Sequence, residues 1–136
     1  MNYFATGELL PAEDMPKRRH DEADLQRAVV EYLRWSLPLE AVFYSIPNEG
    51  KRGRKTVAQL IGTGLRAGMP DLAVVHCGRS IFIELKTPRG ALSPSQRQMH
   101  ARLHMAGAAV FVCRSVPQVE AALRALDVPL QARVAA

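Results

Sequence analysis

The sequence lacks the features that mark secreted or membrane-embedded proteins. It has only two cysteines, Cys77 and Cys113, which lie in apolar stretches typical of strands and outside any C-x-x-C or Cys/His metal spacing. No apolar run approaches the roughly 20 residues that cross a bilayer, and the first residues lack the apolar core of a secretory signal. We therefore expect a cytoplasmic protein with free, buried thiols and no membrane association.

What the sequence does have is enough residues for one domain and a modest excess of positive charge. The chain has 136 residues, 48% of them hydrophobic, and a net charge of +5, which suits a single buried core. The polar and basic residues of one glycine-containing segment are more informative: Asn48, Lys51, Arg52, Arg54 and Lys55. Such a loop suits contact with DNA phosphates, although an ordinary solvated loop has the same composition.

The order of predicted elements indicates an α/β domain at residues 20–126, between an N-terminal arm at 1–19 and a tail at 127–136. Helices are expected at 21–37, 56–65, 94–106 and 117–126, and strands at 41–47, 71–77, 80–86 and 108–113. This order predicts a mixed central sheet flanked by helices on both faces.

The first predicted helix carries an acidic residue on its apolar side. Asp21 is its expected N-cap, and Leu25, Val29 and Leu33 recur at intervals of four. Three more residues are expected to widen the apolar face: Ala28, Tyr32 and Trp35. Glu22 lies three residues before Leu25, so we expect it on the buried side; a favourable charge near a helix N-terminus is the alternative.

The two central strands bring charged residues together. Side chains alternate along a strand, so Glu84 and Lys86 share one face. A two-residue type II′ turn at Gly78-Arg79 would set Asp71 opposite Lys86 and diagonal to Glu84. A four-residue turn would instead set Asp71 directly opposite Glu84, and an odd-numbered turn would separate the two acids onto opposite faces.

Two carboxylates beside a lysine suit the hydrolysis of a phosphodiester bond. Carboxylate oxygens hold Mg²⁺, which binds a phosphate oxygen and lowers the pKa of water. The lysine can orient or deprotonate that water and stabilise the charge that develops on the phosphate. A structural Asp/Glu/Lys network on an exposed sheet face remains the alternative from spacing alone.

Three short motifs occur in order across the centre of the chain. They are Gly68-Met69-Pro70-Asp71-Leu72, Ile83-Glu84-Leu85-Lys86 and Gly90-x-Leu92-Ser93-x-x-Gln96. Further matches are Glu22…Gln26, Pro47-Asn48-Glu49-Gly50 and Gly107-x-x-Val110-x-Val112. Together these motifs resemble the VRR-NUC (virus-type replication-repair nuclease) family of PD-(D/E)xK enzymes over residues 20–126. The resemblance implies a restriction-endonuclease-like fold, dependence on Mg²⁺ or Mn²⁺, and phosphodiester hydrolysis in DNA.

The resemblance also assigns roles to individual residues. Oxygen atoms of four residues are the implied metal ligands: Asp71, Glu84, Leu85 (through its carbonyl group) and Glu22 (directly or through water). Lys86 is the implied catalytic lysine, and Gln96 is implied to face the site. Ser93 and Gln96 also form a capping box in the sequence, which requires no catalysis.

His100 and His104 have the four-residue spacing of a zinc-binding pair on a helix. No third ligand accompanies them, so packing or surface histidines are the favoured interpretation.

The predicted function is that of a DNA endonuclease. Small members of the family are associated with branched DNA, including four-way (Holliday) junctions, and with homodimers, so both are expected here. A nuclease acting on flaps, ends or single strands is the first alternative, and a non-catalytic DNA-binding module is the second.

Overall fold

The computed structural model describes residues 18–47 and 54–131. The expected N-terminal arm up to residue 17, residues 48–53 of the basic segment and residues 132–136 of the tail lie outside the described residues. In the described part, no helix combines the length and the apolar character needed to cross a membrane.

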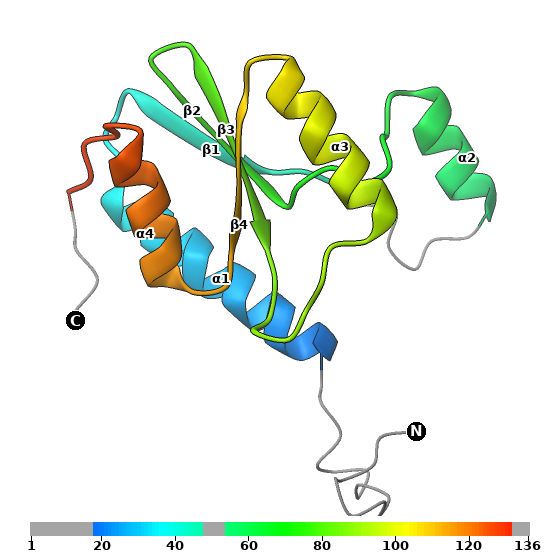
Figure 1. Ribbon diagram of the computed structural model, residues 1–136, viewed down its shortest axis with the longest axis horizontal. Coiled ribbons are helices and arrows are strands. Elements are labelled where there is room, and N and C mark those ends of the chain that lie inside the picture. Colours follow the sequence, from blue (N-terminus) through cyan, green and yellow to red (C-terminus); the bar gives the residue numbers. More distant parts are fainter. Residues whose placement is uncertain (1–17, 48–53, 132–136) are drawn as a thin grey trace, which may run out of the picture.

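Four strands form one mixed sheet in the order β1-β2-β3-β4 (Figure 1). The strands are β1 (Ala41–Ser45), β2 (Leu72–His76), β3 (Arg79–Leu85) and β4 (Ala109–Cys113). The first three are antiparallel neighbours, and β4 runs parallel to β3. The helices are α1 (Arg18–Ser36), α2 (Arg54–Gly62), α3 (Pro94–Met105) and α4 (Val116–Ala125). The predicted order of elements is confirmed.

The main hydrophobic core lies on one face of the sheet, beneath α1 and α4. On β3, Ile81, Ile83 and Leu85 alternate toward this face. They pack with buried residues of both helices: Val29 and Leu33 of α1, and Val119, Ala122 and Leu123 of α4. The spacing of the α1 residues therefore places that helix as predicted.

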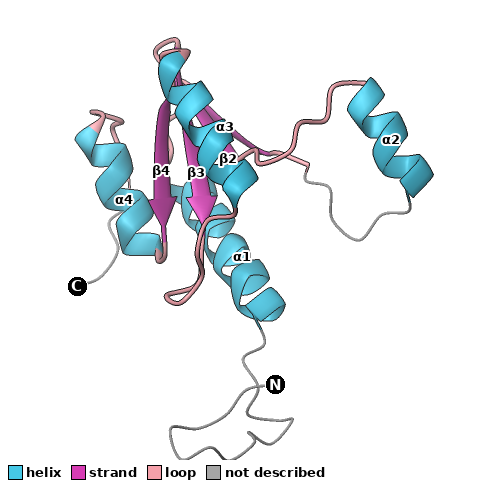
Figure 2. Ribbon diagram, turned by 45° about the vertical axis from the view of Figure 1, so that its right-hand side comes forward, coloured by secondary structure: helices cyan, strands magenta, loops and turns pink. Residues whose placement is uncertain are grey.

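The opposite face of the sheet is covered in part by α3. Phe82 of β3, Ala73 of β2 and Met99 of α3 are buried there, and Figure 2 shows α3 in front of the strands with α1 behind them. The expectation of helices on both faces is therefore confirmed. Val42 and Tyr44 of the edge strand β1 lie on the same face and remain exposed, at 61% and 48%.

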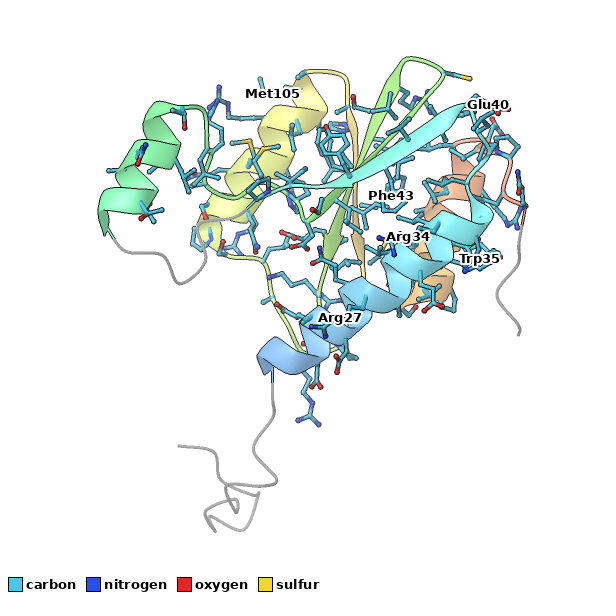
Figure 3. The ribbon with its side chains drawn as sticks, turned by 180° about the vertical axis from the view of Figure 1, so that it is seen from behind. Arg27, Arg34, Trp35, Glu40, Phe43 and Met105 are labelled. Atoms are coloured by element: carbon cyan, nitrogen blue, oxygen red, sulfur yellow. The ribbon has the colours of Figure 1, made fainter. Side chains whose placement is uncertain are left out.

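Two predictions about α1 are wrong in detail. The helix begins at Arg18, so Asp21 lies in its first turn and is not the N-cap. Ala28 is exposed, and Trp35 is 74% exposed. Trp35 lies about 200° around the helix from the buried Leu33 and therefore faces away from the core. Figure 3 shows Trp35 and Arg34 on the outward side of this helix. Tyr32 is half-buried and donates a hydrogen bond of 2.8 Å to Glu120 of α4.

The hairpin between β2 and β3 turns one residue earlier than predicted. His76 pairs with Arg79, so the two turn residues are Cys77 and Gly78. Both have positive φ, 50° and 74°, which is the pattern of a type I′ turn and not of type II′. Cys77 is consequently exposed in the turn, against the prediction, whereas Cys113 is buried in β4 as expected; both thiols are free.

The start of α3 follows the sequence prediction. Ser93 is the N-cap: its hydroxyl accepts the N–H of Gln96, and the Gln96 side chain accepts the N–H of Ser93. This capping box satisfies two of the backbone donors that a helix start leaves free. It fixes the N-terminal end of α3 beside the strands that carry the acidic residues.

Candidate active site

The register of the hairpin places Asp71 directly opposite Glu84. Leu72 pairs with Ile83, so one step further along the two strands brings Asp71 level with Glu84. The prediction that Asp71 lies opposite Lys86 is wrong because the turn is Cys77-Gly78, one residue earlier than Gly78-Arg79. The turn still has an even number of residues, which keeps the two acids on one face.

Asp71 is held at the end of β2 by bonds to both neighbouring strands. Its carbonyl oxygen accepts the N–H of Ile46, which follows β1, at 2.9 Å. Its side-chain Oδ2 accepts the N–H of Leu85 on β3 at 2.7 Å. The carboxylate therefore reaches across to β3 and lies beside Glu84.

Glu84 is a buried acid in an unusual electrostatic setting. Its side chain is 1% exposed, and its pKa is raised from an ordinary 4.5 to about 9, mainly by burial. The hydrogen bond and the charge of Asp71 also contribute to the increase, Lys86 opposes it, and Glu22 makes the smallest contribution, upward. A buried acid beside a second carboxylate in this way forms a site for a proton or for a cation.

Lys86 follows Glu84 on the same face of the sheet, and the loop after it folds back against its stem. A Cβ atom added at Gly90 would lie 3.1 Å from Oγ1 of Thr87 and 3.4 Å from Cδ of Lys86, so a larger residue would crowd Thr87 first. Arg114 braces this loop by donating to the carbonyl oxygens of Thr87, at 2.6 Å, and Gly90, at 2.7 Å. Packing within this loop therefore favours glycine at position 90 of the third motif.

A glycine also shapes the approach to Asp71. A Cβ atom added at Gly68 would collide with the carbonyl oxygen of Ser95 at the start of α3, and Gly68 has a φ of +78°. The chain before Asp71 therefore lies against the capped end of α3, where only glycine fits.

The structure places Glu22 and Gln96 around this centre in different ways. Glu22 is partly exposed in the first turns of α1, close enough for its charge to act on Glu84. Gln96 is half-buried, and its side-chain oxygen accepts the Ser93 N–H at 2.9 Å. The capping function of Gln96 is therefore visible in the structure.

The donors at the site suit a hard divalent cation. Asp71 and Glu84 offer carboxylate oxygens on one face of the sheet, and the Glu84 side chain is almost completely buried. Within residues 18–47 and 54–131, no three His, Cys, Asp or Glu side chains converge to form a cage made only of protein groups. A site with two carboxylates is nevertheless compatible with Mg²⁺, which usually keeps several waters. Glu84, Asp71, the Leu85 carbonyl group and, through water, Glu22 would hold such an ion.

The DNA-binding prediction falls largely outside the described residues. Asn48, Lys51 and Arg52 lie there, as do the side chains of Arg54 and Lys55. The backbone of Arg54 and Lys55 begins α2, two residues before the expected start of that helix.

One residue at the site was missed by the sequence analysis. His100 of α3 lies with its Nε2 atom 3.5 Å from Oε1 of Glu84, and its side chain is 12% exposed. Burial lowers the pKa of His100, and the charge of Lys86 lowers it further, while Asp71 opposes them. His104 is exposed, so the two histidines do not form a metal-binding pair. The sequence held no signal that separates His100 from His104, because the side of α3 that meets the sheet emerges only in the structure, where Met99 is buried.

These features define a class of protein. A mixed sheet carrying Asp on one strand and Glu-x-Lys on its antiparallel neighbour, with helices on both faces, is the core of a restriction-endonuclease-like fold of the PD-(D/E)xK type. The VRR-NUC domain model matches residues 11–117, and the chain belongs to this family. It is accordingly a nuclease-type, DNA-processing protein.

Two solved structures resemble the chain. One, titled a VRR_NUC domain, is 26% identical with a TM-score of 0.54, and the match covers 76% of this chain and 95% of that one. The other, a VRR_NUC domain protein, is 17% identical with a TM-score of 0.56, covering 76% and 84%; at that identity it supports the fold alone. No curated protein sequence matches the chain.

Proposed function

We propose that the protein is a metal-dependent endonuclease that hydrolyses phosphodiester bonds in DNA. The observation that carries this proposal is the pair Asp71 and Glu84, brought level on adjacent strands with Lys86 beside them. Glu84 is almost completely buried, and a buried carboxylate needs a compensating partner.

Each residue of the site has a separate role in the proposed hydrolysis. A bound Mg²⁺ or Mn²⁺ supplies a Lewis acid for the phosphate and activates water. Asp71, its carboxylate fixed by the Leu85 N–H, and Glu84 would hold this ion. Lys86, on the same face of the sheet, would orient the attacking water and stabilise negative charge on the phosphate. Glu22 and Gln96 are assigned supporting roles at the rim.

We propose branched DNA, with four-way junctions as the sharpest case, as the preferred substrate of a homodimer. The match to the nuclease domain covers residues 11–117, so most of the given sequence forms one catalytic unit. Two copies related by a two-fold axis would present two such sites to symmetry-related strands. The exposed Ile61 on α2, at 53%, is one apolar side chain available for such a contact.

A substrate panel tests the activity and its preference together. The purified protein is incubated with duplex, flap, single-stranded and four-way-junction DNA, with Mg²⁺, with Mn²⁺ or with a chelator, and Glu84→Gln serves as the inactive reference. We expect metal-dependent cleavage with junctions cut best. Faster cutting of flaps or single strands would keep the nuclease and reject the junction preference. Binding without cleavage under every metal condition would favour the non-catalytic alternative.

A further inference from the structure

Two buried polar atoms face each other at the site and have no other partner. Oε1 of Glu84 and Nε2 of His100 lie 3.5 Å apart, and neither has a hydrogen-bond partner in the described part of the chain. A buried polar atom that is left unpaired destabilises the folded protein. Glu84 is on β3 and His100 is on α3, so the fold brings these two unpaired atoms together.

We propose that His100 is a positioning residue that holds Oε1 of Glu84 and so aims the second carboxylate oxygen at the divalent ion between Glu84 and Asp71. This inference rests on the proposed metal-dependent function. It adds to the metal ligands a side chain that acts on the ion only through Glu84.

The geometry of Glu84 supports this division between its two oxygens. Oε1 lies 3.5 Å from Nε2 of His100, which leaves the other oxygen of the carboxylate for Asp71 and the proposed ion. One side of the carboxylate thus faces Asp71 and the proposed ion, while the other side faces His100. An acid with a free torsion about its terminal bond needs such a second contact if it is to keep one orientation.

The element that carries His100 is well suited to this role. α3 is fixed at its start by the Ser93 capping box and by the close approach of Gly68. Met99, next to His100, is buried against the sheet. The position of the imidazole relative to β3 is therefore set by rigid elements and not by a loop.

The test compares two substitutions at His100 with a matched control on the same helix. His100→Phe keeps a ring and removes the donor, whereas His100→Gln keeps a donor. His104→Phe introduces the same change at an exposed position four residues later. Mn²⁺ affinity is measured by calorimetry on the DNA-free protein, and the Mn²⁺ dependence of cleavage is measured separately. Thermal unfolding in chelator reports whether each variant is folded.

We expect His100→Phe to weaken Mn²⁺ binding by about tenfold or more, with cleavage largely recovered at saturating Mn²⁺, because supporting residues of metal ligands have effects of this size. His100→Gln should recover much of the affinity, and His104→Phe should bind Mn²⁺ like the unmodified protein.

Unchanged Mn²⁺ affinity in a folded His100→Phe protein would overturn the role of His100. A Glu84→Gln variant separates this result from failure of the proposed function. If Glu84→Gln loses Mn²⁺ while His100→Phe does not, only the His100 inference is wrong. If the unmodified protein binds no Mn²⁺, both proposals fail.

Discussion

Asp71 and Glu84 share one face at the open end of a hairpin, and the charge of Asp71 helps to raise the pKa of Glu84. The proposed function needs both as carriers of the ion and Lys86 as the neighbouring cation. Their individual removal is the most direct test of the mechanism.

We expect Asp71→Ala, Glu84→Ala and Lys86→Ala each to lower the cleavage rate at least about a hundredfold. Because Asp71 and Glu84 carry the ion, raising the metal concentration within an ordinary range should not rescue their variants. Glu22→Gln should be milder, since Glu22 has the weakest influence on Glu84. Single-turnover kinetics measures the rates, and circular dichroism checks the fold. Near-normal activity in any of the three alanine variants would contradict the mechanism.

The raised pKa of Glu84 predicts how stability depends on pH when no metal is present. The pKa is about 9 in the folded protein against an ordinary 4.5, so between these values the folded state retains a proton that the unfolded chain releases. Unfolding then releases a proton, and the free energy of unfolding falls as pH rises. The contribution of Glu84 to the free energy of unfolding is complete below pH 4.5 and is lost as the pH rises to about 9.

Thermal unfolding in chelator between pH 6 and 9 measures this effect. The melting temperature of the unmodified protein should fall over this range more steeply than that of Glu84→Gln, which has no proton to lose. Parallel curves for the two proteins would show that Glu84 ionises freely in the folded state.

The identity of the acids and the lysine could be predicted from the sequence, but the role of His100 could not. Asp71, Glu84 and Lys86 stand in motifs whose spacing and strand alternation define a shared face. His100 and His104 are spaced by four residues and lie on one side of a helix, so the sequence treats them alike. Which of them is covered depends on where α3 crosses the sheet, a property of packing between distant segments.

Among the connecting segments, the one that joins α2 to β2 packs Gly68 against the start of α3, where a larger residue has no room. We expect Gly68→Ala to lower the free energy of unfolding by at least about 3 kcal/mol, since left-handed strain adds to overlap with the Ser95 carbonyl group. Gly78→Ala is the matched control: its φ of +74° is close to the +78° of Gly68, but nothing lies within 4 Å. Its cost should be about 1 kcal/mol.

Chemical denaturation of both variants measures the difference. Equal costs would mean that α3 moves away from Gly68 without penalty. Because α3 carries His100, such a movement should also weaken Mn²⁺ binding.

The hairpin shows how far local sequence rules determine a turn. Gly78 correctly indicates a two-residue turn, and the even length correctly keeps Asp71 and Glu84 on one face. Glycine is accepted at the second position of a type I′ turn and at the first of type II′. The burial of both strands decides between these two registers. In the observed register Cys77 is a turn residue and has an unusual φ of 50°.

For the chain as a whole, the path of the DNA backbone is predicted to include the segment from Lys51 to Lys55. Replacing Arg52 and Arg54 by Ala should weaken binding to all sequences alike. The salt dependence of binding should decrease by about one unit of slope for each lost phosphate contact. Fluorescence anisotropy titrations at several salt concentrations provide the measurement. An unchanged slope would redirect attention to the basic residues at 17–19.

The assembly is predicted to be a symmetric dimer that makes paired nicks at related positions in a four-way junction. Light scattering at micromolar concentration gives the mass, and mapping of the cut strands gives the symmetry. Ile61→Asp should shift the protein toward the monomer if α2 forms the contact, whereas Val42→Asp tests the exposed sheet face in the same assay. A monomer that cuts junctions at one position only would contradict the dimer.

The type I′ turn also exposes a cysteine that can be labelled. Cys77 is exposed at the tip of the hairpin, and the only other cysteine, Cys113, is buried, with a pKa raised by burial to about 11. A maleimide probe should therefore label the natural sequence at one position. Five strand residues separate this tip from the acidic end, a span of about 17 Å, so a fluorophore there would leave the acids free. In a dimer, energy transfer between two such labels would report how the protomers are oriented on bound DNA.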